Sequence, residues 1–256
     1  MSDLPSSGRQ LRTEVTAAGE LKLNLVDVPT APPKPEQVVV RVEASPINPS
    51  DLGLLLGMAD VSTAKQVGTD DNPAISADVP PAILPHLKAR WDESMPVGNE
   101  GGGVVIAAGD SEAAQALLGK TVGVLGGAMY AEYRTLHVSQ CLAMHEGVTP
   151  RESASCFVNP LTALGMVETM NREGFKALIH TAAASNLGQM LQKICLDDDV
   201  GLVNIVRKPE QAELLRGIGA SHVCDSSQDS FMADLTAAIA DTGAYLAFDA
   251  TGGGEL

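Results

Sequence analysis

Apolar and polar positions alternate in short runs through the N-terminal part of the chain, up to about Thr149. Alternation with a period of two places the apolar side chains on one face of an extended strand. A turn at Gly19 and Glu20 separates the first two runs, which predicts an opening β-hairpin. We expect this β-rich part to contain strands in the segments LRTEVTAAGE, LKLNLVDVP, EQVVVRVEASPIN, GGGVVIAAG, KTVGVLGG and AEYRTLHV.

Residues 58–97 depart from this pattern. They contain five prolines, the single tryptophan and little periodicity apart from a short helical candidate near Ala82–Arg90. Unstructured segments of this length are uncommon inside compact domains and are usually functional or disordered. We therefore interpret residues 58–97 as a long loop on the active-site side of the domain.

From about Thr149 onward, helical periods alternate with short apolar runs. Pro150 and Pro160 stand where helices can begin, and Gly219 closes a later helix. The helices are expected in RESASCFV, LTALGMVETM, NLGQMLQKICLDD, PEQAELLRGIG and SFMADLTAAIADTG, and the strands in KALIHTAA, GLVNIVR, SHVCD and AYLAFDATGGG. This βαβαβαβ order predicts a parallel, doubly wound sheet.

Composition and charge narrow the class of protein. A length of 256 residues suggests two domains, and 45% apolar residues can fill their cores. A net charge of −15 argues against a nucleic-acid partner. The N-terminus has no signal-like segment, and no run approaches the ~20 apolar residues of a membrane span, so no membrane partner is expected. Reduced thiols in a cytoplasmic protein are predicted, because no CxxC pair occurs among Cys141, Cys156, Cys195 and Cys224.

The segment LIHTAAASNLG, residues 178–188, resembles a dinucleotide-binding turn. If Gly188 is the last glycine of a G-x-G-x-x-G fingerprint, Ala183 and Ser185 occupy the first two glycine positions. Small residues there still let the backbone approach a pyrophosphate. Ser185 and Asn186 are both good helix N-cap residues, and N–H groups at the helix N-terminus, with Leu187 next in the chain, would face the pyrophosphate. The alternative is an ordinary tight turn between a strand and a helix.

The next predicted strand ends at Val206 and is followed directly by Arg207 and Lys208. An acidic residue at this position would accept hydrogen bonds from the ribose of NAD, whereas a cation suits the 2′-phosphate of NADP. Arg207 lies nineteen residues after Gly188, the expected distance. The pair therefore predicts NADP(H) as the cofactor, although two cations at a strand end are otherwise a solvated surface feature.

Several segments in this order resemble the medium-chain dehydrogenase/reductase superfamily, on its quinone oxidoreductase and enoyl reductase side: ASPINPSDLGLLLG, VGNEGGGVVIAAG, GGAMYAEY, NPLTALGM, HTAAASNLGQML and VNIVRKPEQAELLRGIGASHV. The resemblance implies a β-rich GroES-like catalytic domain over residues 1–148. It further implies a Rossmann dinucleotide-binding domain over 149–256, with a partial doubly wound parallel sheet.

The resemblance also implies which residues act. In the zinc-dependent relatives, a Cys and a His hold the catalytic metal at positions that read Asn48 and Asn99 here. Asparagine is a poor zinc ligand, so no metal is expected. Both amides would instead donate hydrogen bonds to a substrate oxygen, unless they only tie loops together. Tyr130 is the candidate in place of the proton-donating tyrosine of some relatives.

The remaining cofactor contacts follow from the same motifs. Asn159 and Thr162 in NPLTA resemble residues that contact the nicotinamide half, and Thr251 and Gly252 follow the fourth strand where the ring would lie. The activity implied is hydride transfer from NADPH to a quinone or an α,β-unsaturated carbonyl without zinc, in a protein that is a homodimer when full length.

The family continues beyond residue 256, so we expect a C-terminally truncated relative. The fourth strand would then be an uncovered apolar edge on which Tyr245, Leu246 and Phe248 lack partners. Such a chain is expected to be unstable and catalytically feeble. The competing hypothesis is a non-catalytic or inactive relative that at most binds nucleotide or a protein partner.

Overall fold

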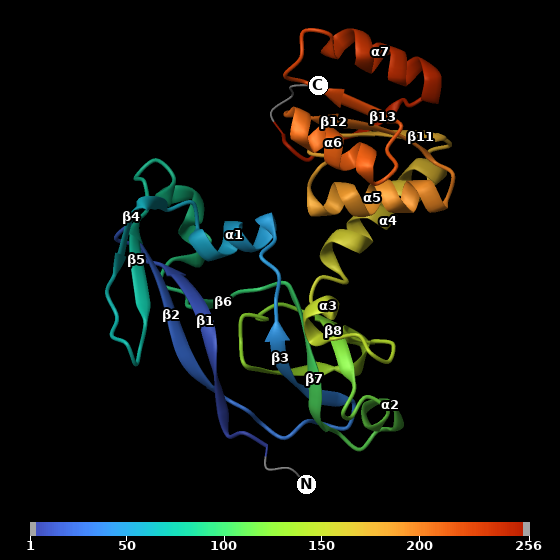
Figure 1. Cartoon of the computed structure of the whole chain (residues 1–256). Coiled ribbons are helices and arrows are strands. Elements are labelled where there is room, and N and C mark those ends of the chain that lie inside the picture. The colour runs from blue at the N-terminus through green and yellow to red at the C-terminus, as the bar shows by residue number, and fades with distance from the viewer. Residues whose placement is uncertain (1–3, 253–256) are drawn as a thin grey trace. The chain divides into compact units, whose positions relative to one another are not determined.

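A computed structural model describes residues 4–252 of the chain (Figure 1). It divides into two compact units, Met1–Phe157 and Val158–Leu256. This boundary corrects the expected division after residue 148. Helix α3 (Pro150–Ser153) packs against strands β7 (Glu100–Ala108) and β8 (Thr121–Leu125), and it therefore belongs to the first unit.

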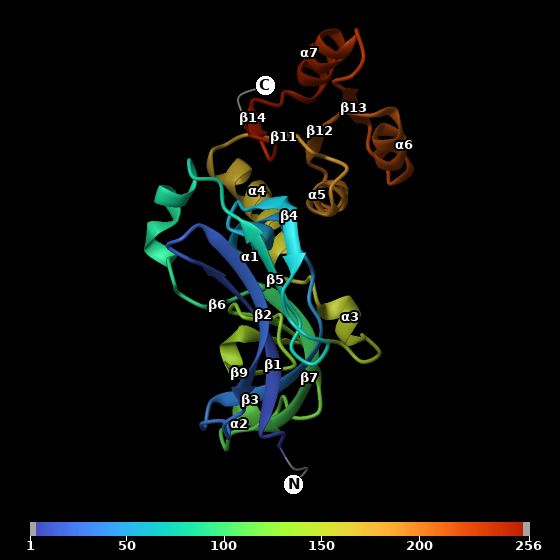
Figure 2. The same cartoon turned by 90° about the vertical axis from the view of Figure 1, so that its left-hand side faces the viewer.

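The first unit consists of two antiparallel sheets, so its expected β-rich character is confirmed (Figure 2). One sheet has the order β4-β5-β2-β1-β6 and the other β10-β8-β7-β3-β9. The expected hairpin is formed by β1 and β2, which pair from Ser7↔Pro29 to Val15↔Leu21. The remaining strand bounds are β1 (Ser7–Val15), β2 (Glu20–Pro29), β3 (Gln37–Ala44), β4 (Asp60–Gln66), β5 (Ala74–Asp78), β6 (Met95–Pro96), β9 (Tyr133–His137) and β10 (Cys141–Ala143). The short helices are α1 (Pro49–Leu56), η1 (Leu84–Arg90), α2 (Glu112–Gln115) and η2 (Val138–Gln140).

Alternating side chains of these strands form the core of the second sheet. Val38 and Val40 of β3 meet Val122 and Val124 of β8 in a cluster that excludes water. Each of these side chains points to the same face because residues two apart in a strand share a face. The alternation seen in the sequence therefore translates directly into burial.

The expectation of a long loop over residues 58–97 is wrong. This segment contributes β4, β5 and β6 to the first sheet, and the helical candidate is the 3-10 helix η1. The residues of β4 are almost all exposed, so the strand carries no apolar alternation that the sequence could display. Trp91, just after η1, packs against the cluster around Val15 and Leu21.

Helix α1 was not among the elements expected from the sequence. Asn48 is its N-cap, Pro49 opens its first turn, and Gly57 ends it with a φ of 53°. Proline fits the first helical position because the N–H it lacks has no partner inside the helix there. Pro49, five residues after the end of β3, therefore starts a helix.

The second unit is the predicted parallel sheet, in the order β13-β12-β11-β14. Its elements are α4 (Val158–Arg172), β11 (Ala177–His180), α5 (Asn186–Asp197), β12 (Gly201–Val206), α6 (Pro209–Gly217), β13 (His222–Asp225), α7 (Phe231–Thr242) and β14 (Leu246–Phe248). Clusters of buried side chains join α4, α5 and α6 to one face and α7 to the other. Figure 1 shows these two layers on either side of the sheet.

The expected lack of partners on β14 is correct for one residue and wrong for two. Tyr245 is 78% exposed. Leu246 and Phe248, in contrast, pack against the cluster that holds Leu178 and Leu191, because they point toward α4 and α5. Among the described residues β14 pairs with β11 alone. No helix within residues 4–252 is long and apolar enough to cross a membrane.

Candidate functional site

The turn between β11 and α5 has the geometry of a close backbone approach. Ala182 takes a φ of 51°, a left-handed conformation that reverses the chain after the strand. Ala183 is fully buried beneath α5. A Cβ on Gly188 would lie 2.1 Å from the carbonyl oxygen of Ala183, so only glycine lets this helix pack so near the turn.

The N-terminus of α5 has unfilled hydrogen-bond donors. Ser185 is the N-cap, and its hydroxyl accepts the N–H of Gly188 at 3.1 Å. Among the described residues, the N–H groups of Asn186 and Leu187 have no acceptor. Free N–H groups and the positive end of the helix dipole favour an anion at this place.

Arg207 lines the same groove as Ser185, the N-cap of α5. A groove of about 220 Å³ is lined by Ala182, Ala184, Ser185, Ile205, Val206, Arg207 and Gln211. Arg207 and Lys208 are both exposed and form no ion pair with any described residue. The structure therefore brings together Ser185 and Arg207, two residues that the sequence placed on successive strand ends.

The end of β14 is held by a carboxylate that sequence reasoning missed. Asp249 Oδ1 accepts the hydroxyls of Thr181 and Thr251, at 2.8 and 2.7 Å, and the N–H of Thr251 at 2.9 Å. These hydrogen bonds, chiefly from the Thr251 and Thr181 hydroxyls, lower the pKa of Asp249 to about 2. Thr251 is therefore tied to the end of β11 next to it, while Gly252 follows with a φ of 72°.

Two cofactor candidates lie elsewhere in the second unit. Asn159 and Thr162 occupy the first two turns of α4 and do not line the groove. The Thr162 hydroxyl donates to the Val158 carbonyl at 2.6 Å, within its own helix. The structure thus leaves their contact with a nicotinamide ring as a prediction.

In the first unit, one buried carboxylate brings Asn48 and Asn99 together. Asp51, in the first turn of α1, accepts the N–H of Asn48 at 2.8 Å and the N–H of Asn99 at 2.9 Å, one on each oxygen. The residue is 2% exposed. Asp51 was not among the sequence candidates, although its position three residues after Asn48 is a capping-box signal.

The amides of both asparagines donate inside the unit. Asn48 Nδ2 donates to Glu100 Oε1 at 3.0 Å, and Asn99 Nδ2 donates to Ser50 Oγ at 2.9 Å. Glu100, which is fully buried, also accepts the N–H of Phe157 at 2.9 Å. These bonds join the start of α1 to the residues that begin β7, which is the loop-tying alternative.

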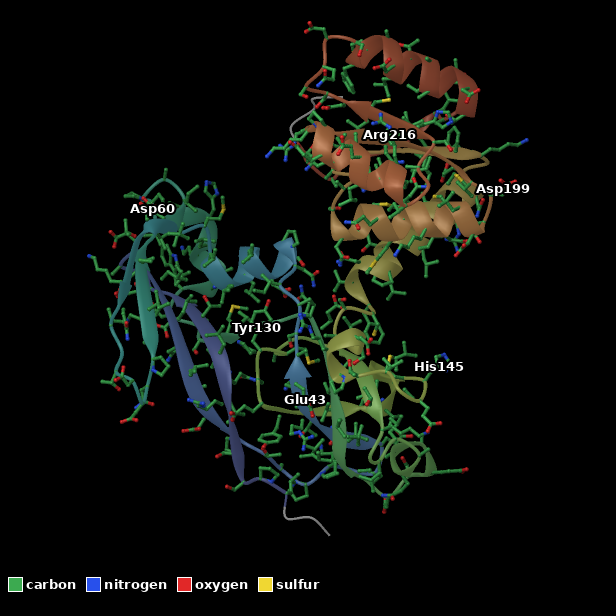
Figure 3. The ribbon with its side chains drawn as sticks, viewed as in Figure 1. Glu43, Asp60, Tyr130, His145, Asp199 and Arg216 are labelled. Carbon is green, nitrogen blue, oxygen red and sulfur yellow. The ribbon has the colours of Figure 1, made fainter. Side chains whose placement is uncertain are left out.

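Tyr130, labelled in Figure 3, belongs to the same unit and lies close enough to Asp51 to be influenced by its charge. Its hydroxyl donates to the carbonyl oxygen of Pro46 at 3.0 Å. Burial raises the pKa of Tyr130 to about 12, and the negative charge of Asp51 adds to the rise. The phenol is therefore neutral at physiological pH and can act as a hydrogen-bond donor.

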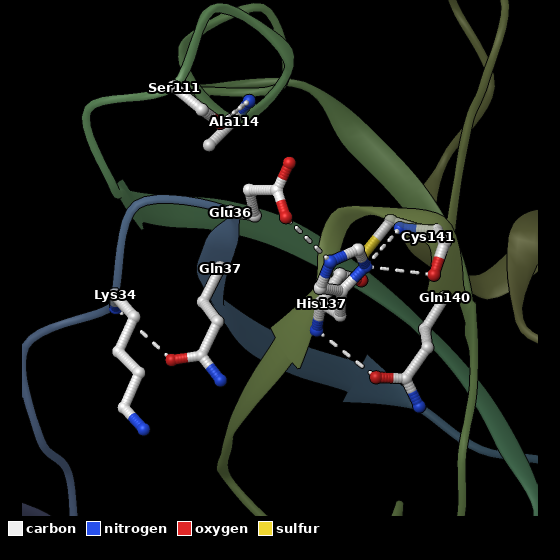
Figure 4. A network of polar contacts seen from close by, with 9 residues as sticks. Lys34, Glu36, Gln37, Ser111, Ala114, His137, Gln140 and Cys141 are labelled. Atoms are coloured by element: carbon white, nitrogen blue, oxygen red, sulfur yellow. Dashed lines mark hydrogen bonds and ion pairs between the residues drawn. The ribbon is translucent and has the colours of Figure 1, made fainter.

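The other side chains with reactive groups, a histidine and two cysteines, have structural surroundings. His137 accepts the N–H of Ser139 and contacts Glu36 at 3.3 Å, a network that joins the end of β9 to the start of β3 (Figure 4). Burial raises the pKa of Cys141 to about 11, and burial raises that of Cys195 to about 12, so neither is a thiolate at neutral pH. Within residues 4–252 no three His, Cys, Asp or Glu side chains converge on a common point that could hold a metal ion.

Comparisons with known proteins agree with this architecture. No family model matches the chain. The mitochondrial enoyl-[acyl-carrier-protein] reductase of Xenopus tropicalis is 27% identical over 214 residues, which cover 80% of this chain and 53% of that protein. The synaptic vesicle membrane protein VAT-1 homolog of Rattus norvegicus is 25% identical over 238 residues, 91% of this chain and 52% of that protein. The chain thus spans about half the length of these curated relatives.

A solved structure is similar to the chain in both fold and sequence. The crystal structure of a protein assigned as an NADPH:quinone reductase, from Mesorhizobium loti, superposes with a TM-score of 0.69 at 26% identity. The match covers 98% of this chain and 69% of that one. In the order of its motifs and in its two-unit architecture the chain is similar to quinone reductases and enoyl reductases, which agrees with the expected resemblance to that side of the medium-chain dehydrogenase/reductase superfamily.

Proposed function

We propose that the protein is an NADPH-dependent oxidoreductase that transfers hydride to a quinone or an α,β-unsaturated carbonyl without zinc. The observation that carries the proposal is the groove of the second unit, which Arg207 lines together with Ser185, the N-cap of α5. The names of the relatives, an enoyl reductase and an NADPH:quinone reductase, support the reaction class.

The residues of the second unit fit a dinucleotide phosphate. The missing Cβ at Gly188 keeps the helix against the turn, and the N–H groups of Asn186 and Leu187 suit the pyrophosphate. Arg207 and Lys208 offer charge-assisted hydrogen bonds to the 2′-phosphate. Thr251, which hydrogen-bonds to Asp249, follows the carboxyl end of β14. Folds of this class bind ligands at the carboxyl ends of their parallel strands.

The first unit would supply the groups for the substrate oxygen. When bound, NADPH supplies a hydride, so that the acceptor gains this hydride and one proton while NADP⁺ forms. Tyr130 keeps its proton on the Oη atom at neutral pH and can donate it into a hydrogen bond. Asn48 and Asn99 donate neutral amide hydrogen bonds, and an asparagine pair in place of thiolate and imidazole suits a reaction without zinc.

A second function is favoured by one observation. The three polar side chains assigned to the substrate all donate hydrogen bonds within the first unit, to Glu100, Ser50 and Pro46. Such a network holds loops together without any substrate. The second candidate is therefore a non-catalytic relative that binds NADPH through its second unit and turns nothing over.

Cofactor binding is the first test. We expect isothermal calorimetry to give tighter binding of NADPH than of NADH, and Arg207→Ala to weaken NADPH about tenfold or more while NADH is nearly unchanged. Arg216→Ala is the matched control, because Arg216 lies in the last turn of the same helix that follows Arg207 and does not line the groove. Equal loss of both cofactors, or no loss, would contradict the proposal.

Turnover then separates the two functions. NADPH oxidation is followed at 340 nm with a panel of benzoquinones, naphthoquinones and enones, in parallel with elemental analysis for zinc. Oxidation that depends on the acceptor, by protein free of stoichiometric zinc, supports the reductase. NADPH binding without turnover on any acceptor supports the non-catalytic relative. Activity that disappears with a chelator contradicts the zinc-free mechanism.

A further inference from the structure

Gln211 lines the same groove as Arg207. It is the third residue of α6 and is half-buried, and neither its residue type nor its position marks it in the sequence. Its Oε1 atom accepts the backbone N–H of Arg207 at 3.1 Å. The side chain therefore turns back over the start of α6, toward the residue that the cofactor would contact.

This hydrogen bond fixes which end of the amide is which. An N–H group can only be accepted by the amide oxygen, so Oε1 faces Arg207 and the NH₂ group takes the other side. The Nε2 atom of Gln211 has no acceptor among the described residues. A carboxamide thus stands in the groove with its acceptor engaged and its two donors available.

Apart from Arg207 and Gln211, the side-chain donor in the groove is Ser185, whose hydroxyl accepts the N–H of Gly188 and keeps its own O–H as a donor at the start of α5. Ala182, Ala184, Ile205 and Val206 contribute apolar side chains and backbone. The polar character of the groove wall along α6 is accordingly determined by Gln211. A phosphate only accepts hydrogen bonds at this position, whereas a ribose hydroxyl can also donate one.

We propose that Gln211 determines the choice between NADPH and NADH by donating its Nε2–H to the 2′-phosphate. The inference rests on the proposed function, since it assumes that the groove holds the adenosine end of NADP(H). Its Oε1 atom also keeps the backbone of Arg207 in position, so the Gln211 amide and the Arg207 guanidinium contact the same phosphate. A carboxylate at this residue would repel the phosphate and accept a hydrogen bond from the 2′-hydroxyl of NADH.

Gln211→Glu is the decisive variant. The carboxylate still accepts the N–H of Arg207, and an acidic residue in the first turn of a helix does not weaken it. Loss of folding is therefore not expected, and the melting temperature should match that of the wild type. Calorimetry should give a loss of NADPH affinity of about 100-fold or more, with NADH affinity unchanged or raised. Gln211→Met, which removes the donor without adding charge, should weaken NADPH about tenfold.

Gln66→Glu is the matched charge control. Gln66 is an exposed residue of β4 that does not line the groove, and the variant adds the same charge. If Gln211→Glu leaves the ratio of NADPH to NADH affinity as Gln66→Glu leaves it, the inference is overturned. The proposed function survives such a failure if the wild type binds NADPH and Arg207→Ala abolishes its preference for NADPH over NADH. A wild type that does not bind NADPH overturns both.

Discussion

The two units use their polar side chains in opposite ways. In the first unit, Asp51 accepts two backbone N–H groups, and the amides of Asn48 and Asn99 donate to neighbouring side chains. In the second unit, the guanidinium of Arg207 and the NH₂ group of Gln211 line a groove and have no partner among the described residues. The first region is closed by its own hydrogen bonds, and the second is open to a ligand.

This difference predicts which substitutions change the stability of the fold and which change the affinity for a ligand. A closed, buried network contributes to folding because breaking one of its bonds leaves a buried group unsatisfied. Open donors at a groove contribute little to folding and are satisfied by solvent or a ligand. Substitutions in the first unit should therefore act mainly on stability, and those at the groove mainly on affinity. Gly188 is the exception, because its substitution should reduce both stability and affinity. The N-terminus of α5 can lie at the groove only while Gly188 packs against Ala183.

Gly188→Ala should have the largest effect. The new Cβ would lie 2.1 Å from the backbone oxygen of Ala183, which cannot move like a flexible side chain. We expect a loss of at least about 3 kcal/mol in the free energy of unfolding, measured in urea, together with loss of NADPH binding. Gly165→Ala is the control in helix α4, where the added Cβ meets nothing within 4 Å. It should change stability by less than about 1 kcal/mol, in the stabilising direction. Equal effects of the two variants would contradict the packing argument.

Asp51→Asn tests the closed network. The amide oxygen can accept one of the two N–H groups, but the NH₂ group faces the other and leaves it unsatisfied. We expect a loss of about 1–3 kcal/mol in the free energy of unfolding, with NADPH affinity unchanged. Asp27→Asn is the matched control and should be near wild type, because the side chain of this exposed β2 residue forms no hydrogen bond or ion pair with any described residue. A stable Asp51→Asn protein that had lost NADPH binding would reverse the comparison.

His180 should make the second unit sensitive to acid. The residue is fully buried, and this burial lowers the pKa of its imidazole. Below a pH of about 6.5 the unfolded chain binds a proton that the folded chain does not, so stability falls as the pH falls, by at most about 1.4 kcal/mol per pH unit for one group. Urea unfolding between pH 7 and pH 5 measures this slope. His180→Gln should reduce it, and an unchanged slope would show that other groups cause the acid sensitivity.

Tyr130 should produce the smallest and most specific signal. Its raised pKa of about 12 means that the phenol stays neutral while an unfolded tyrosine ionises near pH 10, so folded stability decreases between these two values. Absorbance at 295 nm should contain a late phase near pH 12, which Tyr130→Phe removes. In Asp51→Asn this phase should move to lower pH because the nearby negative charge is gone. A late phase that persists in Tyr130→Phe would assign it to another tyrosine.

Much of the second unit was determined by local sequence. The strands and helices from β11 to β14 follow apolar periods, proline starts and a glycine stop that each act within a few residues, so the βαβ order was predictable. The same local patterns indicated a helix N-cap at Ser185 or Asn186 and placed Arg207 just after β12, whereas the roles of these residues toward a cofactor stay predictions. The hairpin of β1 and β2 was predictable for the same reason. Periodicity and capping are properties of neighbouring residues, and they need no knowledge of distant ones.

Only the tertiary structure decided what depends on residues far apart in the chain. The exposed strand β4 exists because it pairs with β5, and Asp51 matters because Asn99, forty-eight positions away, donates to it. Gln211 is an ordinary helical glutamine until the fold sets it beside Ser185 across a groove. Leu246 and Phe248 are half-buried because α4 and α5 cover that face of the sheet. Pairing, burial and hydrogen bonding between distant segments arise only when the chain has closed on itself, and no local pattern records them.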